Sequence, residues 1–482
     1  MTRARHILTL CSFVLLRKDA AKGFSSSYSL RPSPLSNCMM VYSSSSSHDD
    51  SSPNSLAEKY RELSHSIASQ FSPTEFNPLP SLTNCHIQTI AGVYLRKSDS
   101  CKYVKDSNVA ASLFPDFFAS PDQGEFYDSR QRFETSDNDF FDVDFKFSNR
   151  ETKKPSSKGM VIVLHGLQSN SQSSLCLDMA TAYLKNGFDV ACMNFRGCSG
   201  EMNRKMGGYH LGFTDDVKQF LGHLKKDQEE IYPTAAAAPP LFLSGFSLGS
   251  NVVLKCLGEL GEAAHRDFNV YGAAVCGAPF DQERNINFVQ APGFNRLVYM
   301  NFLLKSLKER SLQQLDLFEG SQEWEKVDYE KVANAKSIAD IENAVLAPIY
   351  GFRDNIDYYR RSSCLRFLDN ITIPTLIVNA ADDPFFDPDP DAFPWHRSSD
   401  CDGSSPIRMV RTDHGGHLGF MFHQELRTAW NESSSKCYES KERASWMPSE
   451  LSRFLNSVLE HREKLDSLKS LVSGKASIAS VR

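Results

Sequence analysis

A serine lies at the centre of the pentapeptide Gly245–Gly249, which reads G-F-S-L-G. The apolar run Pro240–Leu243 precedes it, and a segment with helical spacing, Asn251–Leu260, follows it. A G-x-S-x-G motif between a strand and a helix is typical of a sharp turn that lifts the serine hydroxyl above a sheet. Both glycines are needed because the turn brings neighbouring backbone close to them. The pattern predicts Ser247 as a nucleophile at a helix N-terminus, where the helix dipole favours developing negative charge.

A nucleophilic serine needs a base within hydrogen-bond reach, and the base needs an orienting group. In this type of site the acid and then the histidine follow the serine along the chain. Asp382 and Asp383 come after one predicted strand, and His414 and His417 come after the next. The place of Asp382 in the turn favours it over Asp383 as the acid, and both aspartates remain candidates. His417 is preferred as the base because two glycines precede it and Gly419 follows it.

Acyl transfer also needs two preorganised N–H donors for the oxyanion. The backbone N–H of Leu248, directly after the nucleophile, is one predicted donor. The loop His165-Gly166-Leu167 follows a predicted strand, and the N–H of Leu167 is the other. The chemistry requires no cofactor, and no metal-ligand spacing is visible in the sequence.

Apolar runs of strand length alternate with helical segments over most of the chain. The runs read as strands are 160–164, 189–195, 240–243, 270–276, 375–378 and 407–410, and residues 140–145 before them alternate in a strand-like way. The helical segments between and after them are 175–185, 214–224, 251–260 and 448–459. This rhythm predicts an α/β fold with a mostly parallel central sheet and helices on both faces.

The rhythm defines the expected domain organisation. Residues 1–50 form a disordered or targeting segment, 51–130 an N-terminal arm, 131–460 the α/β domain and 461–482 a flexible tail. Within the α/β domain, 281–342 is rich in Phe, Leu, Lys and Glu and lacks strand patterning, which predicts a helical cap insertion above the sheet.

Composition limits the classes of function. The 482-residue chain has a net charge of -6, which gives no general electrostatic case for binding nucleic acid.

The first fifty residues are basic, serine-rich and nearly free of acids, a composition typical of a transit peptide for a plastid or other organelle. The short apolar stretch in that segment leaves a secretory signal or membrane association as alternatives. Twelve scattered cysteines without a C-x-x-C pair favour reduced, buried thiols.

Several motifs together resemble one branch of the α/β-hydrolases. It contains plant embryogenesis-associated-like proteins, bacterial esterases of that type, animal abhydrolase-domain phospholipases and yeast medium-chain ester synthases. The matching segments, in chain order, are 84–90 (N-C-H-I-Q-T-I), 132–145, 164–167 (L-H-G-L), 194–198 (N-F-R-G-C), 209–210, 245–251, 347–359, 379–385 and 415–420 (G-G-H-L-G-F). The sequence departs from the family where Gln168-Ser169-Asn170 stands in place of the usual E-G-S, beside the oxyanion loop.

The resemblance implies an α/β-hydrolase fold, the Ser247–Asp382–His417 triad and an acyl-ester substrate. The expected function is a serine carboxylic-ester hydrolase for short- to medium-chain acyl esters or lipids. An acyltransferase that makes esters and a non-catalytic receptor on the same fold are the alternatives. The expected partner is a small-molecule or lipid ester, with peripheral membrane contact and the oligomeric state left open.

Overall fold

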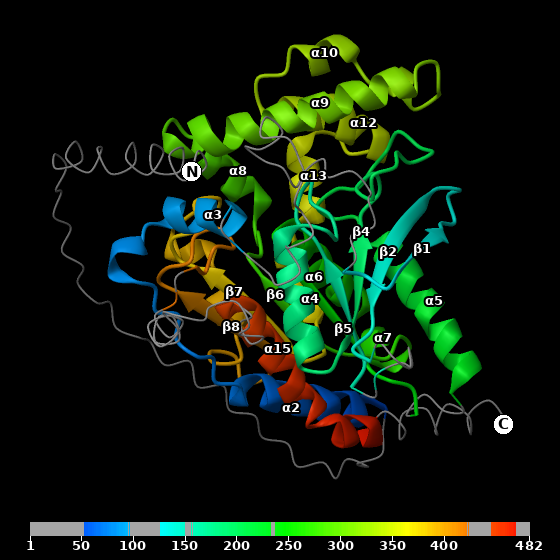
Figure 1. Ribbon diagram of the computed structural model, residues 1–482, viewed down its shortest axis with the longest axis vertical. Coiled ribbons are helices and arrows are strands. Elements are labelled where there is room, and N and C mark those ends of the chain that lie inside the picture. Colours follow the sequence, from blue (N-terminus) through cyan, green and yellow to red (C-terminus); the bar gives the residue numbers. More distant parts are fainter. Residues whose placement is uncertain are drawn as a thin grey trace, which may run out of the picture. The chain divides into compact units, whose positions relative to one another are not determined.

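An eight-stranded sheet forms the centre of the described part of the chain (Figure 1). The computed structural model describes residues 53–94, 96, 126–149, 156, 158–232, 237–421, 423 and 445–468. The strands are β1 (Ser129–Glu134), β2 (Phe140–Lys146), β3 (Met160–Leu164), β4 (Asp189–Asn194), β5 (Leu241–Phe246), β6 (Val270–Cys276), β7 (Thr375–Ala380) and β8 (Ile407–Thr412), in the spatial order β1-β2-β4-β3-β5-β6-β7-β8. The β1–β2 and β2–β4 pairs are antiparallel, and the remaining pairs are parallel.

Helices cover both faces of this sheet, as the strand sequences require. Strands β4 to β7 are buried at every residue, which explains their near-continuous apolar runs. Alternate residues of β3 enter different cores because successive side chains of a strand point to opposite faces. Val161 and Val163 belong to the core that contains buried residues of the helices α2, α4 and α15, and Ile162 and Leu164 belong to the core of α5 and α6. The bounds of these helices are α2 Pro53–Gln70, α4 Ser174–Lys185, α5 Asp215–Ile231, α6 Leu248–Leu260 and α15 Trp446–Leu459.

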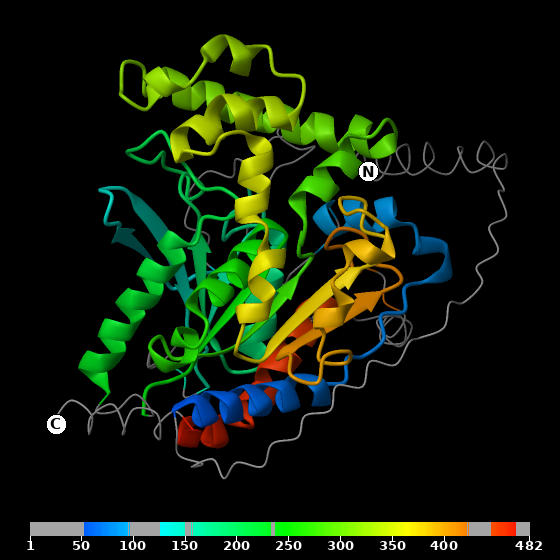
Figure 2. The same cartoon turned by 180° about the vertical axis from the view of Figure 1, so that it is seen from behind.

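The chain between β6 and β7 contains helices only. They are α8 (Gln282–Gln290), η4 (Arg296–Met300), α9 (Asn301–Leu317), η5 (Trp324–Lys326), α10 (Tyr329–Ala333), α11 (Ile338–Ile341), η6 (Glu342–Leu346), α12 (Ala347–Tyr350), α13 (Asn355–Ser362) and η7 (Cys364–Asn370). Figure 2 shows α9, α10 and α12 gathered at one end of the sheet, beyond the carboxyl ends of its parallel strands. The helical character predicted for 281–342 is present and continues as far as Asn370.

The arm before the sheet contributes two shorter elements. These are η1 (Pro80–Leu82) and α3 (Cys85–Tyr94). In both views α3, drawn in blue, lies at the β7–β8 side of the sheet, near the carboxyl ends of those strands (Figures 1 and 2). The arm therefore reaches the edge of the sheet where the polar loops of the predicted site begin.

The strands predicted from alternation or from apolar runs are all present as β2 to β8. β1 was not predicted, because Phe133 is its only buried residue and the strand lacks an apolar run. The flexible tail predicted for 461–482 is wrong for its first part, since residues 462–468 are helical and Leu465 is fully buried; residues 469–482 lie outside the described part of the chain. The predicted targeting segment, 1–50, lies outside the described residues. None of the described helices combines the length and the apolar character that a membrane span needs.

Candidate active site

Ser247 lies in a sharp turn that joins β5 directly to α6. Its backbone is left-handed, with φ 53° and ψ −123°, a conformation that costs a non-glycine residue free energy. A Cβ on Gly249 would lie 2.2 Å from the carbonyl oxygen of Leu164, and a Cβ on Gly245 would lie 2.8 Å from the backbone of Gly249. The two flanking positions therefore accept only glycine, and the strain is held by the packing of β5 and α6 against β3.

A continuous chain of hydrogen bonds runs from this serine to an aspartate. His417 Nε2 is 3.0 Å from Ser247 Oγ, and His417 Nδ1 is 2.8 Å from Asp383 Oδ2. A carboxylate only accepts, so Nδ1 carries the proton that it donates to Asp383, and Nε2 is free to accept the proton of the serine hydroxyl. The Asp383 side chain is 2% exposed, and its Oδ1 accepts the N–H of Phe385.

The structure corrects the choice of Asp382 as the acid. Asp382 Oδ1 accepts the backbone N–H of Gly416 at 2.8 Å, so this carboxyl group braces the turn before His417 and does not face the imidazole. Burial raises the pKa of Asp382 above its usual value. The two neighbouring aspartates point to different partners because consecutive residues of the turn after β7 face different sides.

The structure brings His417 to Ser247 and leaves His414 at the surface. The His414 side chain is 43% exposed, and its Nδ1 lies 3.5 Å from Asp382 Oδ2. Two left-handed residues, Gly416 (φ 57°) and Leu418 (φ 63°), flank His417. These turns direct the imidazole back toward the serine.

The loop after β3 carries the predicted donor Leu167 and lies beside the serine. A Cβ on Gly166 would lie 3.4 Å from the Ser247 Cβ, so the loop adjoins the serine. The Gly166 carbonyl accepts from His165 Nδ1 at 2.8 Å and from the Ser169 N–H at 3.3 Å. Because the peptide is planar and trans, the Leu167 N–H points away from that held carbonyl.

The hydrogen bonds of its two ring nitrogens fix His165 in one tautomer. Its Nε2 accepts the backbone N–H of Phe195 at 3.1 Å, so the ring proton is on Nδ1 and is donated to the Gly166 carbonyl. The ring is fully buried. The His165 side chain thus braces the loop that carries the predicted oxyanion donor Leu167.

The second predicted donor, Leu248, is the first residue of α6. The first N–H groups of a helix lack a carbonyl partner four residues earlier in the helix, and they lie at the positive end of its dipole. The turn also holds Ser247 in place, since the Ser247 N–H donates to the carbonyl of Cys276 at 3.0 Å. Both predicted oxyanion donors therefore belong to backbone that adjoins the serine.

Aromatic side chains surround His417. The ring of Phe385 lies 4.5 Å from the imidazole, centroid to centroid, and the ring of Phe386 lies 5.5 Å away. Tyr299, from the cap element η4, packs on Phe385 at 4.8 Å. Trp395, further along the same loop, packs on Phe393 at 4.5 Å.

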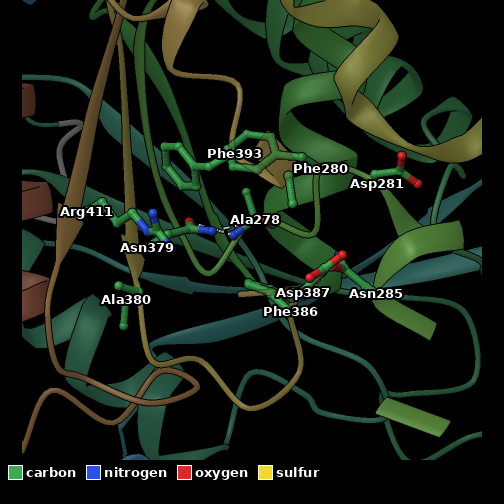
Figure 3. Close-up of a pocket in the computed structure, with 12 residues that line it drawn as sticks. Ala278, Phe280, Asp281, Asn285, Asn379, Ala380, Phe386, Asp387, Phe393 and Arg411 are labelled. Atoms are coloured by element: carbon green, nitrogen blue, oxygen red, sulfur yellow. Dashed lines mark hydrogen bonds between the residues drawn. The ribbon is translucent and has the colours of Figure 1, made fainter. Parts of the chain in front are cut away.

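Phe386 also lines a cleft at the carboxyl ends of β6 and β7 (Figure 3). The cleft is walled by Phe280 and Phe393, whose rings meet edge to face at 5.1 Å. The Arg411 guanidinium lies 5.5 Å from the Phe393 ring. Asn379 also lines the cleft, and its amide exchanges two hydrogen bonds with the backbone of Ala278. The cleft adjoins the histidine through Phe386, and its lining combines three phenylalanines with alanines and with polar and charged side chains such as Asp281, Asp387 and Arg411.

Two contacts of the site were not predicted. Thr89, on α3, accepts the backbone N–H of His417 at 2.9 Å. Ser306, on the cap helix α9, donates to Gln168 Oε1 in the predicted oxyanion loop. Thr89 lies in the family-like segment 84–90, whose motif was the one available signal, whereas nothing in the sequence pairs Ser306 with Gln168.

The described residues offer no protein site for a metal ion. No group of three or more His, Cys, Asp or Glu side chains within them has the arrangement that could hold one. The predicted serine chemistry needs none.

The strand order and the serine turn at the end of β5 define an α/β-hydrolase. A family model described as "Serine aminopeptidase, S33" matches residues 155–417, which is more than half of the chain. "Putative esterase YheT" of Escherichia coli is 30% identical over 365 residues, which cover 75% of this chain and 91% of that protein. The chain belongs to this family, within the abhydrolase-domain α/β-hydrolases.

Two mammalian relatives match less of their own length. "Phospholipase ABHD3" of Bos taurus is 25% identical over 68% of this chain and 70% of that protein. "Monoacylglycerol lipase ABHD2" of Bos taurus is 28% identical over 54% of this chain and 59% of that protein. Among solved structures, the Pyrococcus furiosus esterase Pf2001 is 14% identical with a TM-score of 0.37, over 63% of this chain and 88% of that one.

Proposed function

We propose that this ester-hydrolysing enzyme is a serine carboxylic-ester hydrolase in which Ser247 is the nucleophile, His417 the base and Asp383 the acid. The hydrogen-bond chain from Asp383 Oδ2 through both nitrogens of His417 to Ser247 Oγ carries this proposal. The same three roles, in the same chain order, recur wherever this fold activates a serine.

In the first step Ser247 Oγ attacks the ester carbonyl carbon while His417 Nε2 takes the hydroxyl proton. Asp383 accepts the Nδ1 proton in a hydrogen bond throughout and stabilises the imidazolium that forms. Collapse of the tetrahedral intermediate breaks the bond to the leaving alcohol, which receives the proton from Nε2. The product is an acyl-enzyme on Ser247 and a free alcohol.

In the second step water attacks the acyl carbonyl, and His417 Nε2 again acts as the base. The intermediate collapses with return of the proton to Ser247 Oγ, which releases the carboxylic acid. A second alcohol in place of water gives a new ester by the same steps. Hydrolysis and transfer thus share every residue and differ in the acceptor.

The backbone N–H groups of Leu167 and Leu248 are the proposed oxyanion donors. The hydrogen bonds from His165 and Ser169 to the Gly166 carbonyl support this role for Leu167, because they fix the plane of its peptide before substrate binds. Fixed donors need no reorganisation as charge develops, which is the main source of their effect.

The apolar surroundings favour an acyl chain as the substrate group beside the histidine. Phe385, Phe386 and Tyr299 present rings there, and His86 extends this surface by its hydrogen bond to the Tyr299 hydroxyl at 3.0 Å. Burial lowers the pKa of His86 to about 4, so this ring is uncharged near neutral pH. We propose short- to medium-chain acyl esters or acyl lipids as substrates, in line with the names of ABHD2 and ABHD3.

Hydrolysis of p-nitrophenyl esters of graded acyl length by the wild-type chain and by Ser247→Ala tests the proposal. We expect the wild-type chain to hydrolyse these esters with an optimum at short or medium acyl length. We expect the Ser247→Ala variant to lose this activity. Added alcohol, with analysis of the ester products, measures transfer against hydrolysis. An aminoacyl p-nitroanilide tests the peptidase activity that the family description names. A folded wild-type protein inactive on every ester would overturn the proposal.

A further inference from the structure

Arg96 lies just beyond α3, and its guanidinium holds the loop that carries His417. Its Nη2 donates to the carbonyl oxygen of Leu418 at 2.6 Å and to that of Gly419 at 2.7 Å. These are the two residues that directly follow the histidine. Arg96 is 5% exposed, so water competes little for these bonds.

The positive charge of Arg96 is balanced inside the protein. Its Nη1 donates to Asp178 Oδ2 on α4 at 2.7 Å, and the two side chains are 2% and 4% exposed. The same Nη1 donates to the hydroxyl of Ser445, directly before α15, at 2.7 Å. The guanidinium therefore joins the arm, the histidine loop, α4 and the start of α15, and a planar fork of donors is suited to such a role.

The histidine loop needs an external support because its backbone is strained. Leu418 and Phe420 have φ values of 63° and 45°, in the left-handed region that residues with a Cβ rarely adopt. Such conformations persist only where the surroundings hold them. The carbonyls that Arg96 binds belong to Leu418 itself and to the residue between it and Phe420.

The rest of the arm supports the same loop from α3. Thr89 Oγ1 accepts the N–H of His417, and Gln88 Oε1 accepts the N–H of Met421 at 2.7 Å. A Cβ on Gly419 would lie 2.3 Å from the carbonyl oxygen of Gln88, so the loop and the helix are in direct backbone contact. The family model begins at residue 155, and all of these arm contacts come from outside it.

We propose that Arg96 is a positioning residue for the base: it fixes the backbone after His417 so that Nε2 stays within reach of Ser247 Oγ. The inference rests on the proposed function, because it assigns a purpose to the geometry of His417. Arg96 touches neither the substrate nor the reacting atoms and acts through the carbonyls of Leu418 and Gly419.

Arg96→Lys tests this role with the charge opposite Asp178 retained. A lysine ammonium has its three donors on one atom and cannot span Asp178, Ser445 and two carbonyls. We expect kcat on the best p-nitrophenyl ester to fall about 100-fold with KM unchanged, since a base displaced by about 1 Å loses that much. The rate at which a fluorophosphonate probe labels Ser247 falls in parallel, because that reaction needs the same base.

Lys146→Gln is the matched control. Lys146 is a comparably buried cation, with a side chain 4% exposed, and it pairs with Asp128. It aligns with Val190, near the start of β4, at the opposite edge of the sheet from the site. We expect this variant to lose thermal stability and to keep its kcat and labelling rate, which separates a loss of stability from a loss of positioning.

The double variant Arg96→Leu/Asp178→Leu decides the question if Arg96→Lys does not fold. It removes both charges together, which proteins tolerate better than the loss of one partner, and it also removes the bonds to the loop. Wild-type kcat and labelling in either folded variant would overturn the proposal. A wild-type chain that the probe labels but that cleaves no ester would instead refute the proposed function, and labelling rates would still test Arg96.

Discussion

Asp383 Oδ2 and His417 Nδ1 are 2.8 Å apart, although Asp382 is the residue that touches the backbone of the histidine loop. The two neighbouring carboxyl groups in the turn after β7 thus contact different parts of the histidine loop. Asp383 faces the imidazole and is nearly inaccessible to solvent, with 2% of its side chain exposed, whereas 22% of the Asp382 side chain is exposed. Asp383 orients the imidazole of the proposed base, and Asp382 holds the glycine turn that leads to it.

Asp383→Asn is expected to lower kcat by about 10³- to 10⁴-fold, since an amide in place of the carboxylate favours the wrong tautomer of His417. Asp382→Asn is expected to lower kcat less than about tenfold, because its amide oxygen still accepts the Gly416 N–H through a weaker, uncharged bond. Steady-state kinetics of both variants on one ester, at equal folded concentration, measures the difference. A larger loss in Asp382→Asn than in Asp383→Asn would contradict the assignment.

His165→Phe keeps a buried ring but removes the bond that holds the Gly166 carbonyl. We expect kcat to fall about 10- to 100-fold with a smaller change in KM, because the Leu167 N–H then loses its fixed direction toward the oxyanion. His210→Phe is a matched control, since His210 is also buried and donates nothing to that loop. The two variants are compared by kcat and by thermal melting. Equal kcat values for His165→Phe and His210→Phe would contradict the role of His165 in holding the Gly166 carbonyl.

Glu342 in the cap predicts a pH-dependent stability. Burial raises the pKa of this carboxyl to about 8 from an ordinary 4.5, and the Tyr359 hydroxyl donates to it. The folded state therefore binds a proton that the unfolded state releases, so the stability contribution falls as pH rises from about 4.5 to about 8. Glu342→Gln removes this dependence. Its Tm should exceed that of the wild type by a margin that grows between pH 5 and pH 8; a constant margin would contradict this.

The sequence was sufficient for the parts of the site that depend on local pattern. Ser247 follows from its glycines and flanking elements, and β3 to β7 follow from apolar runs that the buried sheet requires. The preference for Asp382 over Asp383 was wrong because neighbouring residues of a turn face different sides, and the sequence does not show which of the two faces the histidine. The contact between Thr89 and His417 joins residues 328 positions apart, and no local pattern encodes such a pairing.

We propose that residues 1–50 direct the chain to a plastid or another organelle, given their basic, serine-rich and acid-poor composition. A fluorescent reporter fused after this segment should accumulate in that organelle. The same fusion with Arg3, Arg5, Arg17 and Lys18 changed to Glu should not, because targeting segments of this kind depend on positive charge. Identical distributions of the two reporters would refute the proposal.

Covalent trapping of the nucleophile tests the central claim most directly. The full chain is treated with a fluorophosphonate, digested and analysed by mass spectrometry, beside Ser247→Ala and Asp383→Asn. The account predicts one phosphonylated residue, Ser247, with no adduct in the first variant and much slower labelling in the second. An adduct on another serine, or no adduct on a folded protein that cleaves esters, would contradict it.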